Sequence, residues 1–378
     1  MSGPTYPAAR RAAPRIHALF SEHAANAVSR GHHPVATVPD ADAIEAIVSA
    51  GFWSSLRREE SYVPRISLAF VAPHETLHPL LFERRLPLES APLARIAPAV
   101  ERRGIHLGVW PDGGSLTVWG TTRTIPVACF VLEVAAPGLL VVKHHRGGDS
   151  KYANVAVFEA DHIKIVDEQA SSLPDCPGLL ASLVGFESPA SWADSMNVLV
   201  QLAVSMRAHG RGGLLLVVPQ GSEAWRDSIV RPIAYAVAPP FEELAAICRV
   251  ASKIGDRPEW HDALARAIDA VAGLTAVDGA TVVTTEYEVL AFGAKIIRRK
   301  GSPLVDQVTV TEPVEGAPAA LADPTELGGT RHLSAAQFVH DQRDAVALVA
   351  SQDGRFTVFA WSPREAMVHA HRVETLLL

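Results

Sequence analysis

Cysteine and charge are both scarce in this chain of 378 residues. The three cysteines, Cys129, Cys176 and Cys248, are odd in number and far apart. They therefore indicate neither a disulfide framework nor a cysteine-based zinc site, and they favour a reducing compartment. Charged residues make up 20 %, with 34 Lys and Arg against 41 Asp and Glu, which gives a formal net charge of −7. Since binding to nucleic acid relies on an excess of basic residues, no nucleic-acid partner is expected.

The chain also lacks a long, uninterrupted hydrophobic run. Its most apolar stretch, Pro126 to Val142, is broken by Glu133 and Pro137, whereas a membrane-spanning helix needs ~20 predominantly apolar residues. The N-terminus carries Arg10 and Arg11 but has no apolar segment or cleavage site typical of a secretory signal. We therefore expect a cytoplasmic protein with no membrane partner.

Hydrophobic residues, by contrast, make up 48 % of the chain, which is ample material for packed cores and excludes global disorder. At roughly 100–200 residues per domain, the length suggests two domains. The first half has a helical start and then short β-like runs, with glycine turns at 111–114 and 146–149. This pattern predicts a sheet-rich α+β domain over residues 1–187.

The second half alternates helix and strand patterns. After a Ser-, Pro- and Gly-rich connection over 168–191, Ser191 begins a predicted helix with Asp194 in capping-box position, and Gly210 ends it. A buried strand, two helices and a strand–helix–strand tail follow, the first three at 212–219, 241–253 and 260–272. Residues 188–378 are therefore predicted to form an α/β domain in which helices flank a mixed sheet, so that the chain is α/β (α+β overall).

A glycine-rich turn leads into a predicted helix near the C-terminus. The segment GGTRHLSAAQF places Gly329, Thr330, Arg331 and His332 at the helix start. A helix N-terminus presents free backbone N–H groups and about half a positive charge to an anion. Thr330 can cap the helix or hydrogen-bond a phosphate, Arg331 can bind a phosphate bidentately, and His332 adds another donor.

A second segment, VDGATVV, places Asp278 before Gly279 and Ala280 at the start of a strand. A carboxylate at a strand end can hold a divalent metal ion that bridges phosphate oxygens. Each segment alone is ordinary, since Asp-Gly-Ala is usually a turn before a strand. Together, in this order, the two segments predict a site for phosphoryl or nucleotidyl transfer.

With these segments the second half resembles the diadenylate cyclase (DAC, DisA_N-type) domain, a bacterial nucleotidyltransferase that condenses two ATP molecules into the second messenger cyclic di-AMP. The resemblance extends over roughly residues 191–361 and includes SMRAHGRGGLLLVVP and DAVALVASQDGRFTVF. The first half resembles, more loosely, the probable sensor domain, called DACNV, that precedes this cyclase in some bacterial proteins.

The resemblance implies roles for single residues. Asp278 would bind the catalytic Mg²⁺ or Mn²⁺ and help to activate the attacking 3′-hydroxyl. Gly279 and Ala280 would let the ribose and phosphates approach the backbone, while Arg331 and His332 would stabilise charge at the α-phosphorus. The nucleotide-binding residues would be Gly279, Ala280, Gly329, Thr330, Arg331, His332 and Ser351. Two ATP-loaded domains would meet face to face, so a homodimer or higher homo-oligomer is expected, besides an unknown ligand for the N-terminal domain.

Three features depart from the family pattern. Leu333 stands where the family has a second arginine, and Gln352 follows Ser351 where the family has an acidic residue. A Pro-rich insertion over 301–327, either a lid or a loop, separates the two segments. Two hypotheses therefore stand. One is a diadenylate cyclase regulated by its N-terminal sensor domain, and the other is a degraded DAC-like domain that binds nucleotide as a sensor or interaction protein.

Two further patterns do not by themselves indicate a site. Residues 74–78 match the H-E-x-x-H pattern of zinc proteases, but Pro73 and Pro79 flank them and disfavour the helix that this chemistry requires. The basic residues within 295–300 either attract a triphosphate or mark a solvated strand end.

Overall fold

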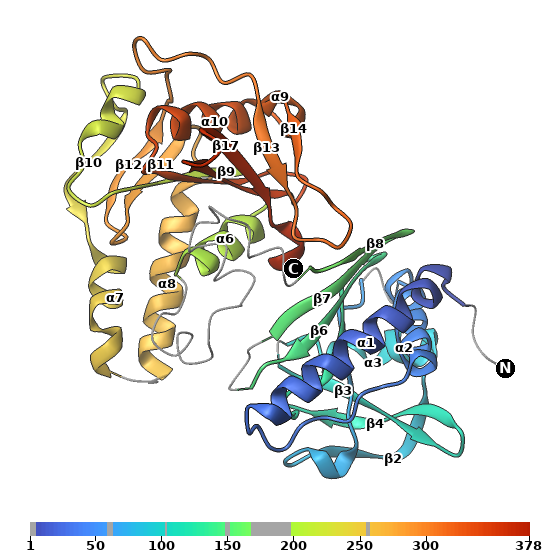
Figure 1. The fold of residues 1–378 in the computed structure, drawn as a ribbon. Coiled ribbons are helices and arrows are strands. Elements are labelled where there is room, and N and C mark those ends of the chain that lie inside the picture. Colours follow the sequence, from blue (N-terminus) through green and yellow to red (C-terminus); the bar gives the residue numbers. More distant parts are fainter. Residues whose placement is uncertain (1–4, 59–62, 103, 148–151, 168–197, 255–257) are drawn as a thin grey trace. The chain divides into compact units, whose positions relative to one another are not determined.

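The computed structural model describes all residues except 1–4, 59–62, 103, 148–151, 168–197 and 255–257 (Figure 1). The chain divides into two compact units, Met1–Val166 with Leu378, and Asp167–Leu377. In each unit helices flank a mixed sheet, which confirms the predicted fold class. The predicted boundary between residues 187 and 188 lies outside the described residues.

The first unit begins with helices that cover one face of its sheet. Pro7 starts the first of them, and its apolar side chains Ile16, Leu19 and Phe20 are buried in the core. Asp40 caps the second, because its carboxylate accepts a hydrogen bond from the N–H of Ala43 at 2.8 Å. The helices are α1 (Pro7–Ser29), α2 (Ala41–Ser55) and α3 (Ser90–Ile96), with 3₁₀ helices η1 (Pro73–Glu75) and η2 (Ala97–Ala99).

Eight strands form the first sheet, in the order β2-β4-β3-β1-β5-β6-β7-β8. Only β1 and β3 pair in parallel among these described strands. The predicted turn at 111–114 joins β3 to β4, whereas that at 146–149 lies partly outside the described residues. The strands are β1 (Ile66–Phe70), β2 (Leu80–Pro87), β3 (His106–Asp112), β4 (Ser115–Thr122), β5 (Phe130–Ala136), β6 (Leu139–His145), β7 (Tyr152–Glu159) and β8 (His162–Ile165).

Nine strands form the second sheet, in the order β10-β12-β11-β9-β15-β16-β17-β13-β14. The central strand β9 pairs in parallel with β11 and antiparallel with β15. The strands are β9 (Gly213–Val218), β10 (Tyr235–Phe241), β11 (Ala280–Thr284), β12 (Val289–Ala294), β13 (Val308–Thr311), β14 (Ala320–Ala322), β15 (Val346–Ala350), β16 (Phe356–Ser362) and β17 (Met367–Arg372).

Strand β9 is buried on both faces, as its unbroken apolar sequence predicts. Leu215 and Val217 face a core with α6 (Val198–Ala208), α7 (Glu243–Ile254) and α8 (Pro258–Leu274). Its alternate residues face a core with α10 (Thr330–Asp341), on the other side of the sheet (Figure 1). The predicted helix start at Ser191 lies outside the described residues, and α6 ends before Gly210.

The Pro-rich insertion over 301–327 is built into the sheet. Its strand β13 pairs in parallel with β17 and antiparallel with β14, and the short helix α9 (Pro324–Leu327) follows. Three further short elements complete the second unit: η4 (Ala224–Ser228), η5 (Glu374–Leu376) and the bridge between Ile229 and Ile296. The insertion therefore adds the strands β13 and β14 to the sheet beside β17.

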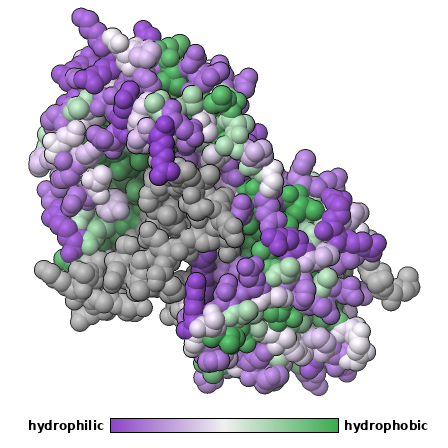
Figure 2. Space-filling view, in the orientation of Figure 1, coloured by the Kyte–Doolittle hydropathy of each residue, from purple (hydrophilic) through white to green (hydrophobic). Residues whose placement is uncertain are grey.

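Hydrophilic side chains dominate the visible surface, with apolar side chains scattered among them (Figure 2). Among the described helices, none combines the length and the apolar character needed to cross a bilayer.

Candidate functional site

The two predicted segments meet at one edge of the second sheet, the edge formed by the ends of its central strands. Because β9 and β11 are parallel, both start at this edge, and the antiparallel β15 ends there, where Ala350 pairs with Gly213. Helix α10 starts at the same edge, since Arg331 lies against the turn that precedes β9. Five residues define what we call the Asp278–Arg331 cluster: Gly212, Asp278, Lys295, Arg331 and Gln352.

Asp278 is the exposed anion of this cluster. Its side chain is 89 % accessible, and the Lys295 ammonium donates a hydrogen bond to Oδ2 at 2.5 Å. The hydrogen bond and the charge of Lys295, with a further contribution from the Arg331 guanidinium, lower the pKa of Asp278. The carboxylate is therefore ionised at neutral pH and faces solvent, where it can meet a cation.

Arg331 is half-buried and lies against Gly212. A Cβ atom on Gly212 would come within 3.0 Å of Arg331 Nη1 and within 3.3 Å of Gln352 Cγ. Gly212 also has a φ of +71°, a backbone conformation that favours glycine. Gly212 was not predicted as a site residue. The signal that could have identified it is the Gly-Gly pair before a buried strand, because glycine lets other groups approach the backbone closely.

Gly279 and Ala280 have roles inside the fold. Gly279 has a φ of +118°, and a Cβ atom there would lie 2.5 Å from the carbonyl carbon of Gly293 on β12. Only glycine allows the two backbones to approach so closely. Ala280 is fully buried in the core beneath α10, so its side chain does not face the cluster.

His332 points into the protein. It is only 2 % exposed, its Nε2 lies 3.5 Å from the hydroxyl of Thr357, and its ring meets Phe359 edge-on. Burial is the largest influence on its pKa and lowers it, so the ring is neutral at neutral pH. Gly328 packs against the same ring, since a Cβ there would lie 2.3 Å from Nδ1. The side chain thus fixes the first turn of α10.

The remaining predicted residues lie around the start of α10 and the end of β15. Gly329 is the N-cap of α10, without a side-chain cap, so the exposed Thr330 takes the first helical position. The Ser351 backbone closes the turn to Arg355, and its hydroxyl hydrogen-bonds the carboxylate of Asp353. Thr330 thus stands at a helix N-terminus where the N–H groups of Thr330 and Arg331 have no intrahelical acceptor, while that of His332 donates to the carbonyl oxygen of Gly329 at 3.0 Å.

The two positions that depart from the family pattern have ordinary environments. Leu333 is half-buried on the first turn of α10. Gln352 is exposed, and its Nε2 donates a hydrogen bond to the carbonyl oxygen of Arg211 at 3.3 Å. Gln352 thus ties the end of β15 to the turn before β9, and it adds no charge to the cluster.

The cluster supplies one carboxylate for a metal ion. The described residues hold no group of three or more His, Cys, Asp or Glu that could bind a metal. Mg²⁺, however, is usually held by one or two carboxylates together with substrate phosphates and water. The exposed Asp278 fits this arrangement only when phosphate oxygens complete the coordination.

The H-E-x-x-H pattern does not form a helix through its two histidines. Only Pro73–Glu75 forms a single 3₁₀ turn, and His78 has a φ of 50°. The Glu75 carboxylate accepts hydrogen bonds from Thr37 Oγ1 and from the N–H of Ala72, both at 2.9 Å. Glu75 therefore stabilises the loop through these two hydrogen bonds.

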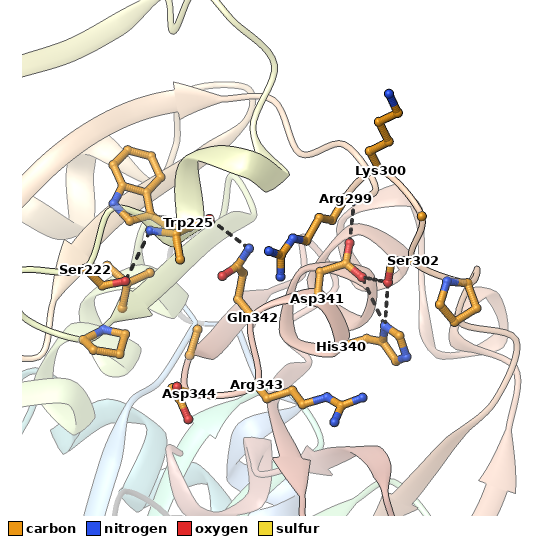
Figure 3. Close-up of a pocket in the computed structure, with 16 residues that line it drawn as sticks. Ser222, Trp225, Arg299, Lys300, Ser302, His340, Asp341, Gln342, Arg343 and Asp344 are labelled. Atoms are coloured by element: carbon orange, nitrogen blue, oxygen red, sulfur yellow. Dashed lines mark hydrogen bonds and ion pairs between the residues drawn. The ribbon is translucent and has the colours of Figure 1, made fainter.

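A cavity of about 700 Å³ lies at the opposite edge of the second sheet, where β9 ends and α10 ends (Figure 3). None of the residues predicted as site residues lines it. Its lining comes from four separate stretches of chain, so no local motif marks it.

The first unit has a recognisable family likeness. Residues 33–123 match the family described as "Probable sensor domain DACNV". The match extends from the segment before α2 to the end of β4 and covers strands β1 to β4. It agrees with the looser resemblance found in the sequence of the first half.

Two solved structures show distant likenesses. One, described as a hypothetical membrane spanning protein from Bacillus cereus, is 14 % identical over 50 % of this chain and 67 % of that chain, with a TM-score of 0.27. Another, a double mutant of DacA from Staphylococcus aureus, is 14 % identical over 46 % of this chain and 83 % of that chain, with a TM-score of 0.23. Because both TM-scores are low, neither structure informs the fold or activity of this chain. No curated protein matches it.

Proposed function

We propose that this protein is a diadenylate cyclase, in which the second unit condenses two ATP molecules into cyclic di-AMP and the first unit acts as a sensor. The observation that carries the proposal is the meeting of Asp278 and Arg331 at one sheet edge, although they come from segments far apart in sequence. The DACNV match of residues 33–123 supports the sensory part. A reaction that consumes ATP also fits the cytoplasmic location expected from the sequence.

The proposed chemistry divides between anion binding and metal binding. Arg331 and the open N–H groups at the start of α10, beside Thr330, would hold the triphosphate. Asp278 would hold Mg²⁺ or Mn²⁺, which would neutralise phosphate charge near the α-phosphorus. His332, neutral and buried, would act through the position of α10 and not as a charged catalyst.

The reaction would form two bonds, each between the 3′-oxygen of one ATP and the α-phosphorus of the other, and would release two pyrophosphates and the two hydroxyl protons. A single chain carries one Asp278–Arg331 cluster, whereas the reaction requires two nucleotides that attack each other. We therefore propose a homodimer, or a larger assembly of such pairs, in which two clusters face each other across a two-fold axis. Positioning and charge stabilisation would supply most of the rate.

A second candidate is a nucleotide-binding sensor without turnover. The contact that favours it is the hydrogen bond from Lys295 to Asp278, because the ammonium occupies an oxygen that a metal ion would need. Leu333 and Gln352 add to this hypothesis, since neither contributes a charge. Such a protein would bind ATP or cyclic di-AMP and leave it unchanged.

The deciding experiment is incubation of the full chain with ATP and Mg²⁺ or Mn²⁺, followed by chromatography for cyclic di-AMP. The cyclase predicts product that is lost in Asp278→Asn, with Asp306→Asn as a carboxylate control outside the cluster. ATP binding by calorimetry without product, in the wild type at concentrations where dimers form, would leave only the sensor hypothesis. Restored product in Leu333→Arg would identify the missing arginine as the cause, and absence of any nucleotide binding would eliminate both hypotheses.

A further inference from the structure

The cavity at the far edge of the second sheet is separate from the Asp278–Arg331 cluster. Its walls are the end of β9, the segment around η4, the loop 299–303 and the end of α10 (Figure 3). Helix α10 starts at the cluster and ends at the cavity, and its 12 residues span about 18 Å. A ligand in the cavity therefore does not share a binding surface with a ligand at the cluster.

The cavity carries an excess of positive charge. Arg299, Lys300 and Arg343 line it, against one exposed carboxylate, that of Asp344. The C-terminal end of α10 adds about half a negative charge, which a single cation more than offsets. Helix-end stabilisation alone therefore does not account for three cations at this place.

The other carboxylate of the lining, Asp341, is committed to the protein. Its side chain is fully buried, and it accepts hydrogen bonds from the N–H of Arg299 at 2.7 Å, Ser302 Oγ at 2.5 Å and Gln337 Nε2 at 2.9 Å. These bonds fix the loop that carries Arg299 and Lys300. Asp341 thus sets the position of the cations while its own oxygens are unavailable to a ligand (Figure 3).

Two arginines bring positive charge to the cavity. The Arg299 guanidinium points toward Gln342 (Figure 3), and its Nη2 forms a long ion pair with Asp227 Oδ2 at 4.0 Å, which is beyond hydrogen-bond distance and leaves its N–H groups able to donate to another anion. Arg343 stacks on Trp361, with its central carbon 4.1 Å from the ring centre. A stacked guanidinium keeps its in-plane N–H donors, which suit the oxygens of a phosphate.

Apolar groups line the rest of the cavity. Pro219, Ala224 and Pro303 present apolar side chains with accessible surface, while Val218 and Trp225 are buried behind them. The volume of about 700 Å³ is within the range of small-molecule sites, and such sites combine apolar walls with a few directed polar groups.

We infer that this cavity is a second ligand site, which binds a small molecule bearing a phosphate group and an apolar or aromatic moiety, of the size of a nucleoside monophosphate. Arg299 binds the phosphate, Arg343 adds positive charge at the rim of the cavity, and the wall formed by Pro219 and Pro303 receives the apolar moiety. The inference does not depend on the proposed cyclase activity, since no residue of the Asp278–Arg331 cluster takes part.

The test is calorimetric titration of the full chain with AMP and, separately, with inorganic phosphate. The first variant is Arg299→Ala with Arg343→Ala, and its matched control is Arg298→Ala, an exposed arginine of the same loop that does not line the cavity. The second variant is Ala224→Phe, which fills the cavity from an exposed position and removes no charge. Circular dichroism and thermal melting verify that each variant folds.

We expect AMP affinity to fall about tenfold or more in both cavity variants, the scale of a lost charge-assisted hydrogen bond, and to be unchanged in Arg298→Ala. AMP binding that is tighter than phosphate binding would show that the apolar wall contributes to the affinity. AMP affinity that is lost in Arg331→Ala but retained in the cavity variants would overturn the inference, as would the absence of heat with both probes at millimolar concentration.

Discussion

The Lys295 ammonium lies 2.5 Å from Oδ2 of Asp278, so the carboxylate offered to a metal ion already has a cationic partner. Both side chains are largely exposed, and an exposed ion pair is weak enough to exchange with solvent ions. Lys295 therefore competes with a divalent cation for Asp278 in the free protein. Once a triphosphate is present, the same ammonium can turn to a phosphate oxygen.

Replacing Lys295 should therefore strengthen metal binding in the absence of nucleotide. In Lys295→Met we expect the affinity for Mn²⁺, measured by electron paramagnetic resonance, to rise by a few-fold, because the competing cation is gone. Arg298→Met removes an equal charge three residues away and should leave the affinity unchanged. Equal Mn²⁺ affinities in the wild type and Lys295→Met would argue that Asp278 is not the metal-binding residue.

Two glycines on the same turn give a matched test of the cluster. Gly210 and Gly212 have φ values of +65° and +71°, so alanine at either position should cost roughly 1–2 kcal/mol of stability. Only Gly212 contacts Arg331, whereas a Cβ on Gly210 meets nothing within 4 Å. Gly212→Ala should thus weaken ATP binding about tenfold, while Gly210→Ala should not. Calorimetry with ATP measures the difference. Equal ATP affinities in Gly212→Ala and Gly210→Ala would argue that Arg331 is not part of the nucleotide site.

Local patterns in the sequence predicted much of the second sheet. The buried strand after Gly212 and the helix that begins at Thr330 follow from apolar periodicity and turn residues, which act over a few neighbours. These local signals indicate that a helix or strand exists and where it begins. They do not state which side chain of a helix turn points inward.

The orientation of His332 shows this limit. Arg331 and His332 are adjacent in sequence, yet the first borders the cluster and the second packs on Phe359 in the core. The difference depends on how α10 sits on β16, which is a tertiary contact. The cavity was equally beyond local reasoning, because its walls come together only when the ends of β9 and α10 meet the loop 299–303.

Asp341 should matter more for stability than any exposed carboxylate beside it. Asp341→Ala leaves the donors of Arg299, Ser302 and Gln337 without their acceptor, at a cost of about 2–4 kcal/mol. Asp344→Ala, at an exposed position three residues later, should change the free energy of unfolding by less than about 0.5 kcal/mol. Urea denaturation of the two variants provides the comparison, and similar losses in both would contradict the role given to Asp341.

Acid should destabilise the first unit through His106. Burial is the largest influence on this residue and lowers its pKa to about 4, while its ring nitrogens hydrogen-bond Ser67 Oγ at 2.7 Å and Tyr152 Oη at 2.8 Å. In the unfolded chain His106 titrates near its ordinary pKa of 6.5, so between pH 6.5 and pH 4 the unfolded state binds more protons. Stability must therefore fall as the pH falls through this window.

Between pH 7 and pH 5 the loss attributable to His106 is about 2 kcal/mol. His106→Gln keeps a polar side chain but does not titrate, so its unfolding free energy should fall less over this interval, although it starts from a lower value. His162→Gln, on the exposed edge strand of the same sheet, should retain the full dependence. Urea denaturation at the two pH values, monitored by near-ultraviolet circular dichroism, gives the pH dependence of the unfolding free energy in both variants. If His106→Gln keeps the wild-type slope, the acid sensitivity must come from another buried group.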